Sequence, residues 1–595
     1  MPPNRLTAQE RIYKMELTTQ KVQNQIKNLI AQGVQKAAAA GALPCAECAA
    51  FNIETPADRC NGDFSTNAAM VNAKTFRLPP RKIAEAIVSF ASTEGTYFEK
   101  VEVAGPGFIN FFLNDVYYAD VLLDVKNAGA DYGKSDYGKG KRLNVEFVSA
   151  NPTGPMHMGN ARGGALGDCL ASVLEYAGFD VSREFYVNDA GNQIDKFALS
   201  LDIRYQQIFK GENSVSLPED SYHGADIKQR AEEFAAVYGS SYLEKSEEER
   251  RKALVDFSLP KNIENMKKAM EKYRIEYDTW FSELTLHNGG ELKDTIELLK
   301  SRGYTYEKDG ALWYKNIEVQ TAMLKEQGKS QEYIDRLELK DDVLIRTNGN
   351  PTYFAADIAY HRNKLQKRGF DKAIDVWGAD HHGHVARMKG AMRAVGIDEN
   401  RLDVLLMQLV RLMSDGKVVR MSKRTGNAIT LVDLLEEVPI DAVRFMFNMQ
   451  EPGSVMDFDL DLAVEQNSQN PVYYCQYAHA RICSILSKLS LEGKTPGSCG
   501  EKQLVRLNAP EEHALITHLA ALPNVIIGAA KNYDPAKVTH YATQLATLFH
   551  KYYNACRVNV EDEELMEARL FLCLCVKDTM KNVLSLLKVD APERM

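Results

Sequence analysis

Residues 143–160 read LNVEFVSANPTGPMHMGN, in which a strand pattern is followed by a proline- and glycine-rich turn. The strand pattern covers Leu143–Val148, and the turn covers Asn151–Pro155. A helical pattern then runs from Met156 to Ala177 and is closed by Gly178, since glycine is common just past a helix end. Strand, glycine-bearing turn and helix are typical of the first unit of a nucleotide-binding α/β fold.

The rest of the chain is long enough to hold several such units. It has 595 residues, which favours three or four domains over a single core. Apolar residues make up 45% and charged residues 26%, as in ordinary globular proteins. The net charge of -9 excludes a uniformly basic nucleic-acid binder, although a local basic patch stays compatible with it.

Pattern changes along the chain predict three domains. Residues 1–112 are expected to form a small α/β domain with strands near 101–113, and the glycine-rich residues 131–140 are a loop. Residues 113–470 are expected to form the α/β nucleotide-binding domain, with a charged, helical insertion at about 190–340 and strands at 343–346 and 373–378. Residues 471–595 have a helical pattern with few breakers, which predicts an all-α domain.

Composition also indicates a compartment. The first ten residues lack the apolar core of a signal peptide, and no apolar run reaches membrane-spanning length, so we expect a cytoplasmic protein without a membrane partner. Several of the ten cysteines lie in apolar stretches, as free thiols of a reducing compartment do. Cys45 and Cys48 have the spacing of half a zinc site, but no second pair follows, which favours ordinary small residues.

Two segments carry chemistry suited to a nucleoside triphosphate. His157 is a donor at a helix start, where the helix dipole favours an anion, and Gly159 lets an adenine ring approach the backbone. Residues 411–424 hold five basic residues and one acid, with a turn at Asp415-Gly416. Lys423 in this loop is a point charge suited to holding pyrophosphate. Taken alone, the segment with His157 and Gly159 is equally well explained as a capped helix with an incidental histidine and glycine. Taken alone, the loop at 411–424 is better explained as a solvated basic loop.

A third cluster, WGADHHGH at 377–384, has two interpretations. Three histidines and an aspartate suit a metal, and Asp380 and His384 would share a helix face. Alternatively a strand ends at Gly378 and the following loop and helix cover an adenosine, since nucleotides lie at the carboxyl ends of parallel strands. We favour the adenosine interpretation and predict no protein metal site. The zinc alternative would use Asp380, His381, His382 and His384.

The segments at 154–160 and 419–424 together resemble the H-x-G-H and K-M-S-K-S signatures of class I aminoacyl-tRNA synthetases. The likeness is closer to arginyl-tRNA synthetases of bacterial type and covers nearly the whole chain. It rests on LNVEFVSANPTGP (143–155), DIAY (357–360), GADHH (378–382), DAVRF (441–445), NPVYYCQYAHAR (470–481), GDFSTN (62–67) and AGPGFIN (104–110). The resemblance implies a Rossmann-like class I catalytic domain with an insertion, a small N-terminal α/β domain for tRNA and an all-α anticodon-binding bundle.

The resemblance also assigns site residues. A guanidinium is a permanently charged planar fork of donors, so its pocket needs carboxylates that accept in pairs. The family pattern places arginine against Glu146, Ser149, Asn151, Tyr353, Asp357 and His381. It places ATP against Pro155, His157, Gly159, Asn160, Gly378, Asp380, His384, Met421, Ser422 and Lys423, with His157 and Lys423 as the catalytic pair. Solvent exposure of Glu146 and a helix-capping role for Asp357 are the alternatives without the family pattern.

The chain departs from the family pattern at three positions. Asn160 stands where the signature has its last histidine, so we expect less reliance on this position and no loss of activity. Arg420 replaces the first lysine of the basic loop, and Arg424 replaces its last serine. Many arginyl enzymes lack the second lysine, but this chain keeps it as Lys423, to which we assign stabilisation of the transition state.

The implied reaction has two steps. L-Arginine attacks the α-phosphate of ATP to give arginyl-adenylate and pyrophosphate, and the terminal adenosine of tRNA then takes the arginyl group. Mg²⁺ is expected to arrive with ATP, and the resemblance implies a monomer that needs tRNA for activation. Predicted tRNA contacts are Phe108, Asn110 and Tyr477, each equally a core or packing residue. The rival hypotheses are a synthetase for another amino acid and a non-catalytic tRNA-binding paralogue.

Overall fold

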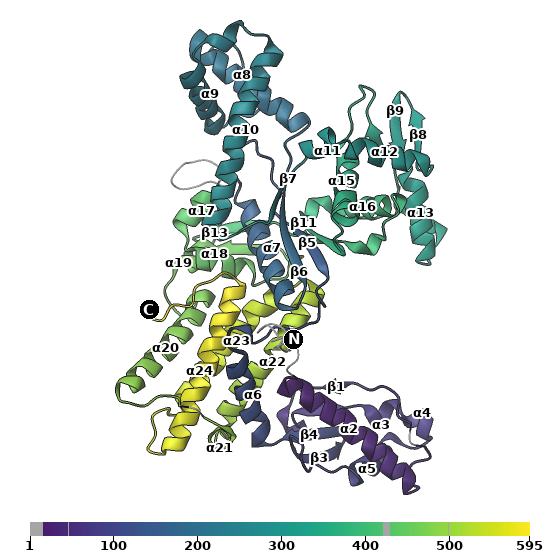
Figure 1. The fold of residues 1–595 in the computed structure, drawn as a ribbon, viewed down its shortest axis with the longest axis vertical. Coiled ribbons are helices and arrows are strands. Elements are labelled where there is room, and N and C mark those ends of the chain that lie inside the picture. Colours follow the sequence, from purple (N-terminus) through teal and green to yellow (C-terminus); the bar gives the residue numbers. More distant parts are fainter. Residues whose placement is uncertain (1–15, 46, 420–428, 498) are drawn as a thin grey trace, which may run out of the picture.

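A parallel sheet of five strands forms the centre of the molecule (Figure 1). The fold is seen in a computed structural model, which describes residues 16–45, 47–419, 429–497 and 499–595. The strand order is β12-β11-β5-β6-β7. The strands are β5 (Arg142–Glu146), β6 (Asp180–Val187), β7 (Thr279–Ser282), β11 (Lys372–Gly378) and β12 (Leu402–Met407). Strands β6 and β11 therefore lie on opposite sides of β5.

Helix α7 (Gly159–Tyr176) connects β5 to β6 and confirms the predicted strand–turn–helix unit. It is buried along most of its length, because the sheet covers one side and the C-terminal helices cover the other. A Cβ atom added at Gly167 would lie 2.2 Å from Cγ of Phe147, so glycine here lets the helix approach the sheet closely. Gly178 follows the helix with φ 90°, as its predicted terminating role requires.

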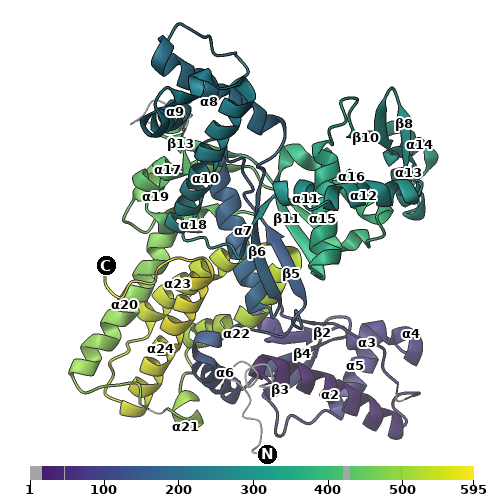
Figure 2. The ribbon, with the colours of Figure 1, turned by 45° about the horizontal axis from the view of Figure 1, so that its top comes forward.

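The region from 190 to 340 differs from the single helical insertion that we predicted. Helices α8 (Asn192–Lys210), α9 (Ala225–Tyr238) and α10 (Glu247–Lys272) form one lobe with its own apolar core. The chain then returns to the central sheet as β7 (Figure 1) before it builds a second lobe, which stands apart from the first (Figure 2). Stacking of Trp280 on Phe185 holds this short strand, whose four residues carry too little pattern to stand out among charged helices.

The second lobe contains a small antiparallel sheet and several helices. Its elements are α11 (Leu284–Asn288), α12 (Glu291–Ser301), β8 (Thr305–Lys308), β9 (Ala311–Tyr314), α13 (Asn316–Glu326), α14 (Gln331–Arg336) and β10 (Asp342–Ile345). Helix α15 (Tyr353–Arg362) continues as a π-helical segment, Asn363–Lys367, and leads into β11. Helix α16 (His382–Ala394) follows β11 after one 3₁₀ turn, which matches the predicted strand end at Gly378.

A second, smaller sheet carries the predicted basic loop. Strands β13 (Val410–Ser414), β14 (Lys417–Val419) and β15 (Met456–Asp459) are ordered β14-β13-β15. Between β14 and β15 lie α17 (Leu431–Glu437) and α18 (Ile440–Phe447), and α19 (Leu460–Val464) follows β15. Residues 420–428, which include the end of the predicted basic loop with Lys423, lie outside the described part of the chain.

The two ends of the chain form separate domains. The N-terminal domain packs α2 (Thr18–Ala39) and α5 (Pro80–Ser89) on an antiparallel sheet of order β1-β2-β4-β3, with short helices α3 (Ala68–Val71) and α4 (Ala73–Phe76). Its strands are β1 (Ile53–Glu54), β2 (Phe64–Thr66), β3 (Phe98–Ala104) and β4 (Phe108–Leu113).

The C-terminal bundle consists of α20 (Pro471–Leu491), α21 (Glu501–Leu504), α22 (Pro510–Asn532), α23 (Ala536–Ala555) and α24 (Glu563–Leu586). Helix α6 (Asp115–Ala128) packs on this bundle.

Helix α22 is long and apolar enough to cross a bilayer by composition, with a mean hydropathy of 1.4 over its best window. Half of that window is buried inside the protein. The helix packs on α23, and the carbonyl oxygen of Leu519 accepts a hydrogen bond of 3.0 Å from the Tyr132 hydroxyl. These contacts are those of a core helix in a bundle.

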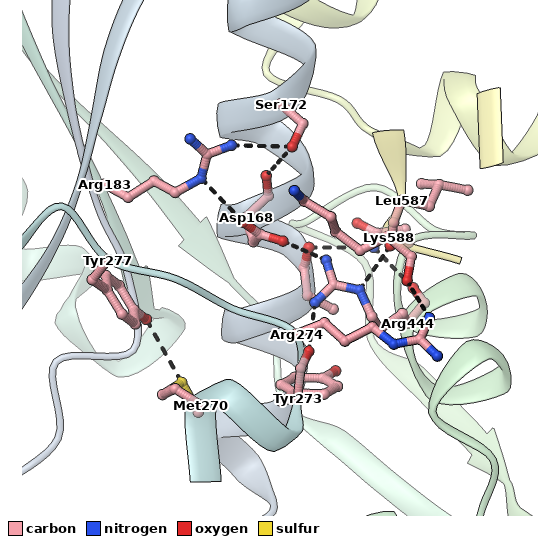
Figure 3. Close-up of polar contacts among 12 residues, drawn as sticks. Asp168, Ser172, Arg183, Met270, Tyr273, Arg274, Tyr277, Arg444, Leu587 and Lys588 are labelled. Carbon is pink, nitrogen blue, oxygen red and sulfur yellow. Dashed lines mark hydrogen bonds and ion pairs between the residues drawn. The ribbon is translucent and has the colours of Figure 1, made fainter. Parts of the chain in front are cut away.

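A single buried arginine joins the central helix to two other parts of the chain (Figure 3). Arg444 on α18 places Nη2 2.5 Å from Oδ2 of Asp168 on α7. Its Nη1 donates to the carbonyl oxygen of Tyr273, just after α10, at 2.8 Å, and its Nε donates to that of Leu587, just after α24, at 2.7 Å. Hydrogen bonds from one side chain thus fix α7 relative to the first lobe and to the C-terminal bundle.

Candidate active site

A cavity of about 620 Å³ opens at the carboxyl ends of β5, β6 and β11. This is the point where the strand order reverses, because β6 and β11 lie on either side of β5, and open α/β sheets bind ligands there. Many predicted site residues line the cavity: Glu146, Ser149, Tyr353, Asp357, Gly378, Asp380, His381 and His384. Residues from three distant segments of the sequence therefore meet at one place.

Asp357 lies on α15 and faces this cavity with a side chain that is 33% exposed. Its Oδ2 is 3.0 Å from Nε2 of His384, on α16. In the described part of the chain Oδ1 has no hydrogen-bond partner, so one carboxylate oxygen faces the cavity without one. Tyr353 begins the same helix and is 38% exposed, at the mouth of the cavity. The helix start is held by Thr352, whose hydroxyl accepts from the Ala355 backbone N–H at 3.4 Å.

Glu146, at the end of β5, is far more buried than the solvent-exposed alternative would allow. Its Oε1 accepts from the Ser149 hydroxyl at 2.8 Å, and its Oε2 accepts from Nζ of Lys364 at 2.5 Å. Burial raises the pKa of the Glu146 carboxyl, and the charge of Lys364 opposes that increase. The carboxylate therefore depends on its cationic partner to stay ionised.

The backbone between Glu146 and the signature turn has an unusual conformation. Val148 and Ser149 have φ values of 73° and 43°, in the left-handed region that β-branched residues rarely adopt. The Ser149 N–H donates to the Phe147 carbonyl oxygen at 3.1 Å, which makes a strained γ-turn at Val148. Ser149 Oγ also accepts from the Tyr186 N–H at 3.1 Å. The turn thereby aims Ser149 across the mouth of the pocket.

The signature residues Pro155, His157, Gly159 and Asn160 are not among the residues that line this cavity, and Pro155 lines a second cavity of about 410 Å³ with residues of α9 and α10. Nδ1 of His157 accepts from the Gly159 N–H at 3.1 Å, so the neutral ring carries its proton on Nε2. Oδ1 of Asn160 accepts from the His157 N–H at 3.1 Å. Asn160 thus caps the local turn, and its amide group remains a possible donor. Asn151 is exposed on the preceding turn.

The described residues that follow the basic loop pair with the signature. The Met158 N–H donates to the Ile429 carbonyl oxygen at 3.0 Å, and the Leu431 N–H donates to the Met156 carbonyl oxygen at 2.9 Å. His157 and Thr430 form an antiparallel bridge. The two signatures, which are 260 residues apart in sequence, are therefore neighbours at their flanks. Met421, Ser422 and Lys423 themselves lie outside the described residues.

The cluster at 377–384 forms the opposite wall. Gly378 ends β11, and a Cβ atom there would lie 2.4 Å from Oδ1 of Asp380. Asp380 and His381 have side chains that are 81% and 58% exposed. Across residues 16–419 and 429–595 with their two single-residue gaps, no three His, Cys, Asp or Glu side chains are grouped to hold a metal ion.

Comparison with known protein families decides the assignment. The class I (R) tRNA synthetase catalytic domain matches residues 124–483, the arginyl-tRNA synthetase N-terminal domain matches residues 24–113, and the DALR anticodon-binding domain matches residues 475–595. The chain belongs to the arginyl-tRNA synthetase family. These matches confirm the predicted fold class, and they confirm the prediction of an ATP-dependent arginine–tRNA ligase over a synthetase for another amino acid.

Full-length relatives agree with the family assignment. The chain is 54% identical to the arginine–tRNA ligase of Caldanaerobacter subterraneus, over 98% of this chain and all of the relative. It is 50% identical to that of Ruminiclostridium cellulolyticum, over 98% and 100%. The arginyl-tRNA synthetase of Thermus thermophilus has the same fold, with a TM-score of 0.69 and 22% identity, over 95% of this chain and 99% of that one.

The predicted tRNA contacts of this arginyl-tRNA synthetase family member differ in exposure. Phe108 is half-buried at the start of β4, and Tyr477 on α20 is 39% exposed and stacks near His550, with ring centroids 6.1 Å apart. Asn110 is only 2% exposed, and its Oδ1 accepts from the Ser65 hydroxyl at 2.8 Å. The amide oxygen of Asn110 is therefore used inside the domain, and its contact with tRNA stays a prediction.

Sequence reasoning missed Tyr186 and Asn188, which line the cavity from the end of β6. The Tyr186 hydroxyl is buried beside the Glu283 carboxylate. Burial raises its pKa well above the ordinary value, and the negative charges of Glu283 and Asp357 add to this increase. The available signal was positional, since the carboxyl ends of parallel strands carry ligand contacts, and residues 180–187 form such a strand.

Proposed function

We propose that the cavity at the ends of β5, β6 and β11 binds L-arginine, which the chain activates with ATP and transfers to tRNA. The observation that carries this proposal is the pair of carboxylates, Asp357 and Glu146, in a cavity of amino-acid size. A guanidinium needs acceptors for a planar fork of donors, and the unpartnered oxygen of Asp357 offers one.

The other end of arginine is assigned to the γ-turn. Asn151 and Ser149 would hold the α-amino group, with the turn fixed by the bonds of Ser149 to Glu146 and Tyr186. His381 lies on the exposed rim opposite, and Tyr353 would close the pocket over the side chain. This orientation leaves the arginine carboxylate at the open side of the cavity, toward the signature helix.

ATP would lie between the amino-acid cavity and the start of α7. Gly378, Asp380 and His384 form the adenosine wall, and Pro155, Gly159 and Asn160 offer backbone and amide contacts. His157 would direct its Nε2–H to a phosphate oxygen, because Nδ1 is already an acceptor. Met421, Ser422 and Lys423 would close on the phosphates from the loop that the flanking pairs tie to the signature. Magnesium enters as part of the ATP complex, held by phosphates and water.

The two steps then use positioning and charge stabilisation. An arginine carboxylate oxygen attacks the α-phosphorus, and the bond to the pyrophosphate oxygen breaks as charge develops near His157 and Lys423. A hydroxyl of the terminal adenosine of tRNA next attacks the arginyl carbonyl carbon, and AMP leaves. Neither step forms a covalent bond to the protein. We assign tRNA-dependent activation to this chain as well, from its family membership.

RNA contacts, oligomeric state and location complete the proposal. Tyr477 is suited to stacking on a base of the anticodon loop, and Tyr473 stacks beside it with ring centroids 6.3 Å apart. Phe108 is suited to stacking on an unpaired base at the N-terminal domain. We propose that the protein is a monomer, because each chain holds one proposed site. The ten cysteines are all free, which fits the reducing cytoplasm.

The proposal is tested by charging tRNA with arginine, using citrulline as a neutral analogue of the same shape. We expect wild-type protein to charge arginine and to discriminate strongly against citrulline. Asp357→Asn should raise the KM for arginine about 100-fold, or about 2.7 kcal/mol, since a charge-assisted hydrogen bond is lost. Asp335→Asn, at an exposed position of α14, is the control. An unchanged KM in Asp357→Asn would place the arginine site elsewhere.

A further inference from the structure

Three acidic residues form a row across the central sheet beneath the proposed arginine pocket. Glu146 on β5 is the register neighbour of Glu184 on β6 and of Asp375 on β11. Register neighbours in a parallel sheet point to the same face, so the three carboxyl groups are adjacent. Their exposed fractions are 6%, 0% and 0%. Three buried negative charges side by side are unstable unless cations or hydrogen bonds compensate them.

The helix that faces the row supplies this compensation. Lys364 bridges two of the acids, since its Nζ lies 2.5 Å from Oε2 of Glu146 and 2.9 Å from Oδ1 of Asp375. Arg368 pairs with Glu184, and Nε2 of His361 lies 2.6 Å from Oδ2 of Asp375. The Lys364 side chain is fully buried and comes from the π-helical segment Asn363–Lys367, an element that is frequent at functional sites.

Only one acid of the row, Glu146, also lines the cavity. Lys364 itself does not line the cavity: its ammonium group lies behind Glu146, to which it is hydrogen-bonded, while Asp357 lies on the cavity wall. Burial would lower the pKa of Lys364, but the charges of Asp375 and Glu146 outweigh burial and raise it, so the group stays cationic. A substrate cation that approaches Glu146 therefore faces this positive charge on the far side of the carboxylate.

We propose that Lys364 is a specificity-determining residue that sets the length of the arginine pocket. Its ammonium group occupies the innermost cation position, between Glu146 and Asp375. The guanidinium of the substrate must then stop at the next position outward, against Asp357 and the cavity side of Glu146. A side chain with one more methylene is refused, because it would bring two cations into contact. This inference rests on the proposed arginine site.

The experiment compares arginine with homoarginine, which is longer by one methylene, as substrates for tRNA charging. The ratio of their kcat/KM values is measured for wild type, Lys364→Ala and Lys364→Met. Lys364→Ala removes the charge and opens space, so the preference for arginine should fall about tenfold or more, the usual worth of a methylene in a pocket. Lys364→Met removes the charge but keeps the volume, so the preference of this variant for arginine over homoarginine should fall less than that of Lys364→Ala.

Chemical rescue of Lys364→Ala distinguishes a role of the Lys364 charge from a purely structural role. Propylammonium matches the atoms that Lys364→Ala lacks, so it should restore the preference for arginine in this variant, and neutral propanol should not. Arg368→Met removes the cation that pairs with Glu184, an acid that does not line the cavity, so the preference of this variant for arginine should stay at the wild-type value. If Lys364→Ala does not fold, the double variant Lys364→Ala/Asp375→Asn, with one fewer buried acid, replaces it.

The outcomes distinguish this inference from the proposed function. An unchanged preference in folded Lys364→Ala, or rescue by propanol as well as by propylammonium, would overturn the role of Lys364. An arginine KM that Asp357→Asn leaves unchanged would overturn the arginine site itself, whatever Lys364 does. A lowered preference that propylammonium restores, together with a raised KM in Asp357→Asn, would support both.

Discussion

At the scale of single residues, the site depends on buried charges that only the fold brings together. The sequence pattern and family resemblance located Glu146, Asp357 and His384, and these residues do meet in one cavity. The partners of Glu146 and Asp375 were not predictable, because Lys364 and His361 lie in a stretch with ordinary helical pattern. Likewise, nothing in the sequence signals the positive φ of Val148, since valine is unfavourable there and tertiary contacts enforce it.

The acid row predicts a dependence of stability on pH. Burial would raise the pKa of Asp375, but Lys364 and His361 outweigh burial and lower it to about 2. A lowered folded-state pKa contributes stability above the unfolded value of 3.8, and this contribution is lost as the pH falls toward 2. It amounts to about 2 kcal/mol at 1.36 kcal/mol per pKa unit.

We therefore expect the thermal midpoint of the wild-type protein to fall as the pH is lowered from 5 to 3, and that of Asp375→Asn to fall less steeply. Midpoints measured by circular dichroism at several pH values test this. Parallel curves for the two proteins would show that Asp375 takes no part in acid destabilisation.

At the scale of elements, close packing of α7 on β5 holds the signature at the edge of the sheet. The sequence predicted this strand, turn and helix, because their apolar pattern and terminating glycine are local features. It did not predict β7, whose four residues are held by stacking on β6. It also did not predict the γ-turn between β5 and the signature, which depends on hydrogen bonds to β6.

Two glycines of α7 provide a matched test of this packing. A Cβ atom at Gly167 would lie 2.2 Å from the Phe147 ring, whereas one at Gly163 would meet its nearest neighbour, Cε of Met407, at 3.5 Å. Gly167→Ala should destabilise the protein by about 1–3 kcal/mol through overpacking. Gly163→Ala should be neutral or stabilising, because alanine favours a helix. Thermal unfolding of both variants tests this difference in stability. Equal midpoints would mean that α7 can move away from β5 freely.

At the scale of the whole molecule, hydrogen bonds from a few buried side chains hold the domains in place. Arg444 links α7, the end of α10 and the end of α24 (Figure 3). Nearby, Arg274 pairs with Asp441 at 2.7 Å and with Asp590 at 2.8 Å, but its side chain is 33% exposed. The three-domain plan was predictable from composition and resemblance. The joints between the domains were not, since their residues come from unrelated segments.

Removing each arginine should have a different effect. Arg444→Met leaves the buried Asp168 with Arg183 as its remaining cation, so we expect a loss of about 3 kcal/mol. Arg274→Met removes a partly exposed pair and should cost about 1 kcal/mol or less. Urea unfolding followed by tryptophan fluorescence measures both. A larger loss for Arg274→Met than for Arg444→Met would contradict this assignment of the central joint.

The central claim is that this chain activates arginine in the cavity beside its two signatures. Arginine-dependent exchange between ATP and pyrophosphate, with and without tRNA, tests it most directly in wild type, Asp357→Asn and Lys423→Ala. We predict exchange with arginine alone among amino acids, only when tRNA is present, with a strong decrease in both variants. Exchange driven by another amino acid, or undiminished exchange in Asp357→Asn at low arginine concentration, would contradict the account.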